Sequence, residues 1–124
     1  MKIRIKGNSI RIRIVKTELD NFGRDGYLEE RTEFGDNYLT YRLESKEGID
    51  NLQAGMKGST ITVYMPEPMQ KEWIATETVG YRNDMPLSNG KSLFILIEKD
   101  FKCLDGEVLE DQSDNFDNPL MECK

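Results

Sequence analysis

The stretch KIRIKGNSIRIRI, residues 2–14, alternates isoleucine with lysine or arginine up to and beyond Gly7-Asn8. Alternation with a period of two is typical of a β-strand that buries one face. Glycine and asparagine adopt the positive φ values that a tight hairpin turn requires. The stretch therefore predicts a β-hairpin with one isoleucine face and one basic face.

The basic face of this hairpin consists of Lys2, Arg4, Lys6, Arg11 and Arg13. A two-residue turn places Arg4 opposite Arg11 and Lys2 opposite Arg13. Like charges directly across a strand pair destabilise it by some tenths of a kcal/mol. We therefore expect compensating groups, and the basic face is the candidate partner-binding site.

Two sources of compensation stay open. Acids of the same chain, such as Glu29, Glu30 and Glu33 or the acidic C-terminal tail, would form a solvated charge ladder. Alternatively, an external ligand would meet the bases, either an acidic protein surface or the phosphates of a nucleic acid. The hairpin lacks the interleaved aromatic residues of a single-strand binder.

The rest of the chain predicts further strands and two short helices. Thr17 to Asp20 resembles a capping box at the start of the first helix. Leu19 and Phe22 would share one face of this helix, and Gly23 and Gly26 limit it to about two turns. The second helix follows Pro66. The predicted strands cover residues 27–34, 38–45, 60–65, 78–82 and 91–98, with a polar connector at 46–58 and a long turn at 83–90.

The two halves of the chain share a layout. Ile10, Ile12 and Ile14 match Ile61, Val63 and Met65 at an offset of 51 residues, and Phe22 matches Trp73. Met69 and Trp73 would share one face of the second helix. We expect pseudo-repeats at about 9–45 and 59–98, each a βαββ unit, which together build a barrel-like sheet without exposed edges.

Composition predicts one folded domain. The chain has 124 residues, of which 37% are hydrophobic and 32% charged, and no apolar run approaches the roughly 20 residues of a membrane span. The net charge of −6 is uneven, because residues 1–16 carry six bases and no acid, while residues 101–124 carry seven acids and two lysines. A basic start and an acidic end suggest two surfaces that meet each other or different partners.

The chemical inventory favours a non-enzymatic role. Histidine is absent, which removes the commonest general base and metal ligand. The N-terminus lacks an apolar stretch of the signal-peptide type, so we expect a cytoplasmic protein in which Cys103 and Cys123 are reduced. Whether these two cysteines ever pair stays open. We expect no cofactor.

A calcium site is only weakly indicated. The stretch DQSDNFDNPLME places acids and amides at calcium-loop spacing, with weak candidates Asp111, Asp117 and Glu122. Phe116 occupies the position where the loop needs glycine, and an acidic tail with Asx-turns explains the same residues.

Two resemblances accompany these patterns. KIRIKGNSIRIR with TEFGDN, and EKDFKCLD with EDQSDNFDNP, resemble a family of small uncharacterised bacterial proteins, which implies no activity. More loosely, ITVYMPEPMQKEWIATETVGY resembles the swapped-hairpin fold of transition-state regulators and antitoxins, which bind DNA as dimers. The net negative charge departs from that pattern.

The sequence thus predicts an α+β domain over residues 1–104: a mostly antiparallel, barrel-like sheet of six or seven strands and two short helices, followed by an irregular acidic tail at 105–124. The favoured function is non-enzymatic binding or regulation through a protein partner, with no membrane contact and an open oligomeric state. A nucleic-acid-binding regulator whose basic face is masked by the tail is one alternative. A small carboxylate enzyme, with Glu29 and Glu33 beside the basic strand in a deep pocket, is the other.

Overall fold

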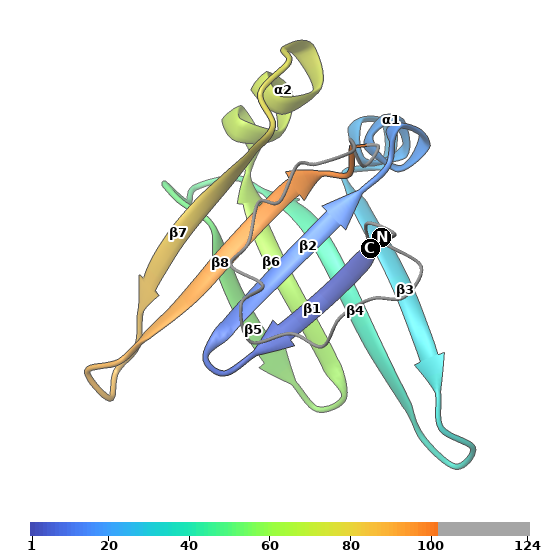
Figure 1. Cartoon of the computed structure of the whole chain (residues 1–124), viewed down its shortest axis with the longest axis vertical. Helices are drawn as coiled ribbons and strands as arrows, with labels where there is room; N and C mark the ends of the chain where they lie inside the picture. The colour runs from blue at the N-terminus through green and yellow to red at the C-terminus, as the bar shows by residue number, and fades with distance from the viewer. Residues whose placement is uncertain (102–124) are drawn as a thin grey trace, which may run out of the picture.

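The computed structural model describes residues 1–101, which form eight strands and two helices (Figure 1). The elements are β1 (Lys2–Lys6), β2 (Ser9–Ile14), α1 (Lys16–Asp25), β3 (Tyr27–Glu33), β4 (Tyr38–Lys46), β5 (Gln53–Lys57), β6 (Thr60–Pro66), α2 (Glu67–Ala75), β7 (Gly80–Pro86) and β8 (Ser92–Lys99). The fold is therefore α+β, as predicted. The predicted acidic tail and the domain boundary at residue 104 lie outside the described residues.

The strands form two four-stranded sheets rather than the expected barrel. Sheet A has the order β1-β2-β8-β7 and sheet B the order β3-β4-β6-β5. Each sheet is mixed, because its two central strands are parallel while each edge strand is antiparallel to its neighbour. Neither sheet closes on itself, so the prediction of a mostly antiparallel, barrel-like sheet is wrong.

Each sheet joins hairpins that are distant in sequence. Sheet A combines the hairpin β1-β2 with the hairpin β7-β8, and sheet B combines β3-β4 with β5-β6. The element order is strand, strand, helix, strand, strand in both halves of the chain. The expected polar connector at 46–58 contains β5, which brings the number of strands above the expected six or seven.

The opening hairpin has the predicted register. Ile5 lies opposite Ile10 and Arg4 opposite Arg11, and Gly7 takes the positive φ of 54° that the tight turn requires. The isoleucines of β2 are buried, so this hairpin contributes its apolar face to the core and turns its basic face outward.

The helices lie together at one end of the two sheets (Figure 1). The rings of Phe22 and Trp73 meet edge to face with 6.3 Å between centroids, and both side chains are fully buried. Buried Gln70 ties the helices together, because its amide nitrogen donates to the carbonyl oxygen of Phe22 at 2.8 Å. The predicted pairing of apolar residues along each helix face is confirmed.

The first helix begins earlier than the predicted capping box implies. Its N-cap is Val15, and the backbone N–H of Val15 donates to Glu18 Oε1 at 2.9 Å. The acid that closes the box is thus Glu18 and not Asp20. The helix ends at Gly26, whose φ of 80° allows the left-handed C-cap.

The core lies between the two sheets and under the helices. It draws on strands of both sheets and on one large aromatic residue from each helix, and it consists of Ile10, Ile12, Ile14, Phe22, Leu43, Leu52, Val63, Met65, Trp73, Ile95 and Ile97. Strand β8 is central in sheet A, as its apolar composition predicted. The predicted strand at 78–82 begins later and runs further, to Pro86, into the expected turn.

Candidate binding face

The basic face lies on the outer surface of sheet A, away from the core. Side chains alternate across a strand, so residues that pair across neighbouring strands share a face. Three neighbouring rows across the sheet contain the bases. The middle row reads Arg4, Arg11, Leu96 and Arg82. The rows on either side read Lys6, Ser9, Phe94 and Asp84, and Lys2, Arg13, Glu98 and Gly80. All five predicted site residues are thus brought together, and Arg82 from β7 joins their surface.

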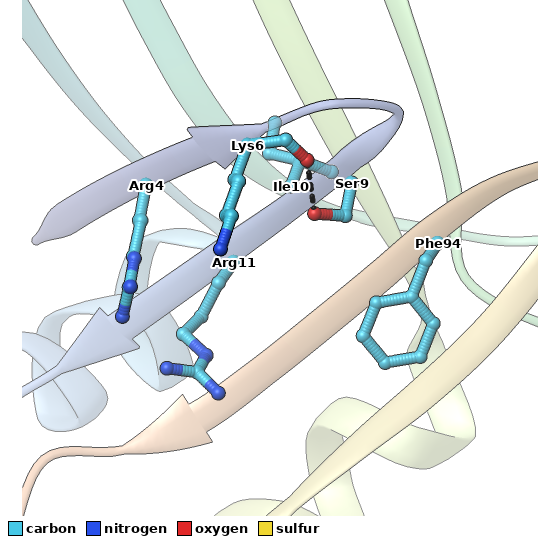
Figure 2. Close-up of a pocket in the computed structure, with 6 residues that line it drawn as sticks. All are labelled: Arg4, Lys6, Ser9, Ile10, Arg11 and Phe94. Atoms are coloured by element: carbon cyan, nitrogen blue, oxygen red, sulfur yellow. Dashed lines mark hydrogen bonds between the residues drawn. The ribbon is translucent and has the colours of Figure 1, made fainter. Parts of the chain in front are cut away.

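A hollow of about 250 Å³ opens on this surface, lined by Arg4, Lys6, Ser9, Ile10, Arg11 and Phe94. Figure 2 shows Arg4, Lys6 and Arg11 extending on the same side of the sheet as the Phe94 ring. The hollow therefore combines cationic groups with an aromatic wall. This combination suits a ligand that carries both a negative charge and an apolar group.

The hollow keeps its shape because the turn of the first hairpin is fastened to β8. The side-chain amide of Asn8 donates to the carbonyl oxygen of Ser92 at 2.6 Å, and the backbone carbonyl oxygen of Asn8 accepts from the N–H of Phe94 at 3.1 Å. Ser9 Oγ donates to the carbonyl oxygen of Lys6 at 2.6 Å (Figure 2). These bonds place Phe94 beside the basic hairpin.

At the other end of the same surface, acids from the end of β8 contact the bases. Arg13 Nε donates to Glu98 Oε1 at 2.7 Å, and Arg11 Nε lies 3.7 Å from the same oxygen. Lys2 Nζ donates to Asp100 Oδ2 at 3.0 Å. Two guanidinium groups share one carboxylate here, so this surface stays positively charged overall.

The acids of β3, which were expected to compensate the basic hairpin, contact other groups. Glu29 accepts from Arg42 Nη1 at 3.0 Å on sheet B, and Glu30 forms an ion pair with the amino group of Met1 at 2.7 Å. The prediction that β3 supplies acids beside the basic hairpin is therefore wrong for these two residues. The deep pocket expected for a carboxylate enzyme would need Glu29 beside the basic strand, and the two lie on different sheets.

The outer surface of sheet B pairs its charges locally. Arg42 contacts Glu29 and Glu44, the latter from Nε at 2.9 Å. Its guanidinium also lies 4.2 Å from the ring centroid of Tyr27. Burial, the largest single contribution, lowers the pKa of Arg42 because it favours the neutral form. The two carboxylates together outweigh burial, so the pKa of Arg42 is raised.

A second hollow lies at the far end of sheet B, and its lining is mainly apolar: Phe34, Asn37, Tyr38, Leu39, Met56 and Ser59. Phe34 and Met56 are well exposed there. This hollow contains no acid or base, so it does not resemble the first one chemically.

Tyr81 and the amino group of Met1, both outside the basic face, have raised pKa values. Burial and a 2.5 Å hydrogen bond to Glu72 raise the pKa of Tyr81 to about 12. The amino group of Met1 also has a raised pKa, because contacts with Glu18 and Glu30 outweigh its desolvation. Neither group lines a hollow described above.

Residues 1–101 contain neither a cluster of metal-ligating side chains nor a membrane-spanning helix. In that part of the chain no three His, Cys, Asp or Glu side chains are arranged to hold a metal ion. The weak calcium candidates, like Cys103 and Cys123, lie outside the described residues. Within the same range no helix has the length and apolar character that crossing a membrane would require.

Sequence reasoning missed Arg82, Phe94 and Glu98 as parts of this surface. The signal for Phe94 was present, because a strand that is apolar on both faces must expose one face of apolar residues in a two-sheet fold unless a helix covers it. The contribution of Glu98 depends on the parallel pairing of β2 with β8, and no local pattern indicates that pairing.

Comparison with known proteins identifies the family. The model of a family of unknown function, DUF7009, matches residues 1–120, which confirms the resemblance to an uncharacterised family. No curated protein and no solved structure matches the chain. Because the match spans nearly the whole sequence, the chain belongs to the DUF7009 family of unknown function.

Proposed function

We propose that this protein is a binding module and that the outer surface of sheet A binds an acidic, extended segment of a partner protein. The observation that carries the proposal is the hollow that Arg4, Lys6 and Arg11 line together with Phe94. The basic face is the partner-binding site, and Arg82 extends it across the sheet.

Charge supports an acidic ligand. The three rows contain six bases and two acids, Asp84 and Glu98. Asp100 adds a third acid where it contacts Lys2, so the bases still exceed the acids. Arginine forms paired hydrogen bonds with carboxylates, and neighbouring strands lie about 4.8 Å apart. An extended chain crossing the strands could therefore place successive carboxylates near successive bases.

The apolar residues on the same surface favour a polypeptide. Phe94 and Leu96 point away from the core and are half-buried between the basic strands and β7. A hydrophobic side chain of the ligand would bury apolar area against them, at about 25 cal/mol per Å². Charged residues would then supply orientation, and the apolar contact would supply much of the affinity.

The test compares two lysines at corresponding hairpin positions. Lys6 ends β1 and pairs with Ser9 on sheet A, while Lys57 ends β5 and pairs with Thr60 on sheet B. Both are exposed and precede a glycine of positive φ. The full chain is used with the seven acids of its C-terminal segment changed to amides, so that these acids do not compete.

The probe is a fluorescein-labelled peptide in which glutamates alternate with serines around one leucine, and binding is followed by anisotropy at low salt. We expect Lys6→Glu to weaken binding about tenfold and Lys57→Glu to change it less than about twofold. Equal effects of the two variants, or no binding by the parent chain, would overturn the proposal.

A single-stranded nucleic acid is the second candidate ligand of the same surface, and the position of Phe94 favours it. An aromatic ring beside arginines offers a stacking platform for a base. Under this alternative, an oligonucleotide probe would bind more tightly than the acidic peptide, with a steep dependence on salt. The net charge of −6 repels any acidic ligand at long range, and it repels nucleic acid more strongly because nucleic acid carries a charge at every phosphate.

We also propose that the two halves of the chain are structural repeats. The corresponding element order and the 51-residue offset between Ile10 and Ile61 support this, as does the exchange of hairpins between the sheets. The same exchange supports the likeness to swapped-hairpin regulators. Under this proposal, one copy of the outer surface became basic while the other kept locally paired charges.

A further inference from the structure

We infer that the acidic C-terminal segment of the chain, residues 105–124, binds the outer surface of sheet A in cis and competes with the external acidic ligand. This inference rests on the proposed function, since it names a resident competitor for the same surface. It would make the binding module autoinhibited, and a partner would bind by displacing the segment.

The end of the described chain leads toward this surface. The N–H of Asp100 donates to the carbonyl oxygen of Ile14 at 2.8 Å, which fixes the chain beside the end of β2. The carboxylate of Asp100 then accepts from Lys2 at 3.0 Å. An acid that follows β8 thus already contacts a member of the basic face, and Phe101 after it is exposed.

The segment has the chemistry that the surface suits. Residues 105–124 carry seven acids and one lysine, with apolar residues such as Val108, Phe116 and Leu120 between the acids. This composition offers carboxylates to Lys6 and the arginines, and an apolar side chain to the hollow beside Phe94. The external ligand proposed above has the same two features.

The segment is also long enough. The rows of Lys2 and Lys6 are four residues apart along β1, which corresponds to about 13 Å. Residues 102–124 can span about 75 Å when extended. A tethered ligand of this kind has an effective concentration in the millimolar range, so even a weak contact would occupy the surface for much of the time.

The first test locates the segment in the full chain. Cys103→Ser leaves Cys123 as the single thiol, which carries a nitroxide spin label, and paramagnetic broadening of backbone amides is recorded by NMR. We expect broadening at Lys6, Ser9 and Arg11 and none at Lys57 or Thr62. The broadening should disappear at about 1 M salt, where charge attraction is screened within about 3 Å.

A matched control is the same labelled chain with its segment acids changed to amides: Asp105→Asn, Glu107→Gln, Glu110→Gln, Asp111→Asn, Asp114→Asn, Asp117→Asn and Glu122→Gln. We expect this variant to lose the broadening. Equal broadening over both sheets, or broadening that persists in the control variant, would overturn the inference.

The second test separates this inference from the proposed function. The glutamate-serine peptide is titrated into the natural chain and into the chain with the neutralised segment. Competition in cis predicts about tenfold tighter binding to the neutralised chain. Equal binding to both chains would refute autoinhibition and leave the proposed function standing, whereas no binding to the neutralised chain would refute the proposed function itself.

Discussion

The two sheets have corresponding strand orders, but their outer surfaces differ in how their charges are paired. On sheet B, Arg42 contacts Glu29, Glu44 and the ring of Tyr27, so one base has three partners of its own chain. On sheet A, Arg11 and Arg13 share the carboxylate of Glu98. Arg42 of sheet B is therefore paired within the described fold, whereas sheet A concentrates like charges around the hollow beside Phe94.

The difference shows what a charged strand face can indicate. Like charges across a strand pair cost stability, and a fold selected for stability alone would separate them as sheet B does. Sheet A places Arg4 opposite Arg11 and adds Arg82 along the same row. Such a concentration is typical of a surface that meets an oppositely charged ligand.

The largest expected effect concerns a glycine at the edge of sheet A. A Cβ on Gly80 would lie 2.1 Å from the carbonyl oxygen of Ile97, whereas a Cβ on Gly55 in β5, an edge strand of sheet B, would meet nothing within 4 Å. We expect Gly80→Ala to lower the free energy of unfolding by about 3 kcal/mol, because the backbone of β7 or β8 must move to make room for the methyl group. Gly55→Ala should raise it by about 0.5 kcal/mol.

Urea unfolding followed by tryptophan fluorescence measures both values. Similar stabilities of the two variants would contradict the close approach of β7 to β8 that helps to shape the outer surface of sheet A.

The next effect is on binding and separates the two candidate ligands. Phe94→Leu keeps an apolar side chain in the hollow but removes the ring, and Phe94→Thr introduces the residue type found at Thr40, the corresponding position on sheet B. If the ligand is an acidic polypeptide, Phe94→Leu should keep peptide affinity within about threefold and Phe94→Thr should lower it about tenfold.

If the ligand is a nucleic acid, both variants should lose affinity, because leucine cannot replace base stacking. Anisotropy with the glutamate-serine peptide and with an oligonucleotide distinguishes these outcomes.

A smaller effect tests the charge pairing on sheet B. Arg42→Met removes two carboxylate contacts and one cation–π contact, so we expect it to lower the free energy of unfolding by about 1 kcal/mol. Arg13→Met on sheet A should cost less than about 0.5 kcal/mol, since Arg11 remains near Glu98. Thermal unfolding at low and high salt gives both values. A larger loss for Arg13→Met would reverse the proposed contrast.

An effect of similar size to that of Arg42→Met, but one that depends on pH, concerns the inner side of β7. The folded state raises the pKa of Tyr81 to about 12, while an unfolded tyrosine has a pKa of about 10. The protonated phenol is therefore favoured by folding, and its contribution is present below pH of about 10 and is lost as the pH rises toward about 12.

We expect Tyr81→Phe to be less stable than the natural chain near neutral pH by about 1 kcal/mol, owing to the lost bond to Glu72. The two stabilities should converge as the pH approaches about 12. Calorimetry across this range measures the convergence, and a difference that does not depend on pH would contradict the assigned pKa.

The sequence predicts local features of this fold better than distant ones. The register from Arg4 to Arg11 follows from alternation and a two-residue turn, and both are properties of adjacent residues. The pairing of β2 with β8 joins segments more than eighty residues apart, so no local pattern specifies it. The prediction of a barrel was wrong for the same reason, because the pattern of residues along each strand does not determine whether two sheets join into one.

The residues of the candidate site also fall into those that a local pattern predicts and those that it does not. Its bases were predicted from the hairpin, while Phe94, Glu98 and Arg82 enter through pairings with β8 and β7. Strand β5 was missed because its sequence, QAGMK, has a glycine at its centre and only one large apolar residue. A weak strand of this kind is stabilised by its neighbour β6 rather than by its own propensity.

The most direct test of the central claim is an NMR titration of the full chain, with its segment acids neutralised, by the glutamate-serine peptide. The account predicts that amide shifts change for Lys6, Arg11 and Phe94 and stay constant for Arg42 and Thr62 on the outer surface of sheet B. Shift changes centred on sheet B, or on the apolar hollow at Phe34, would contradict the assignment of sheet A as the binding surface.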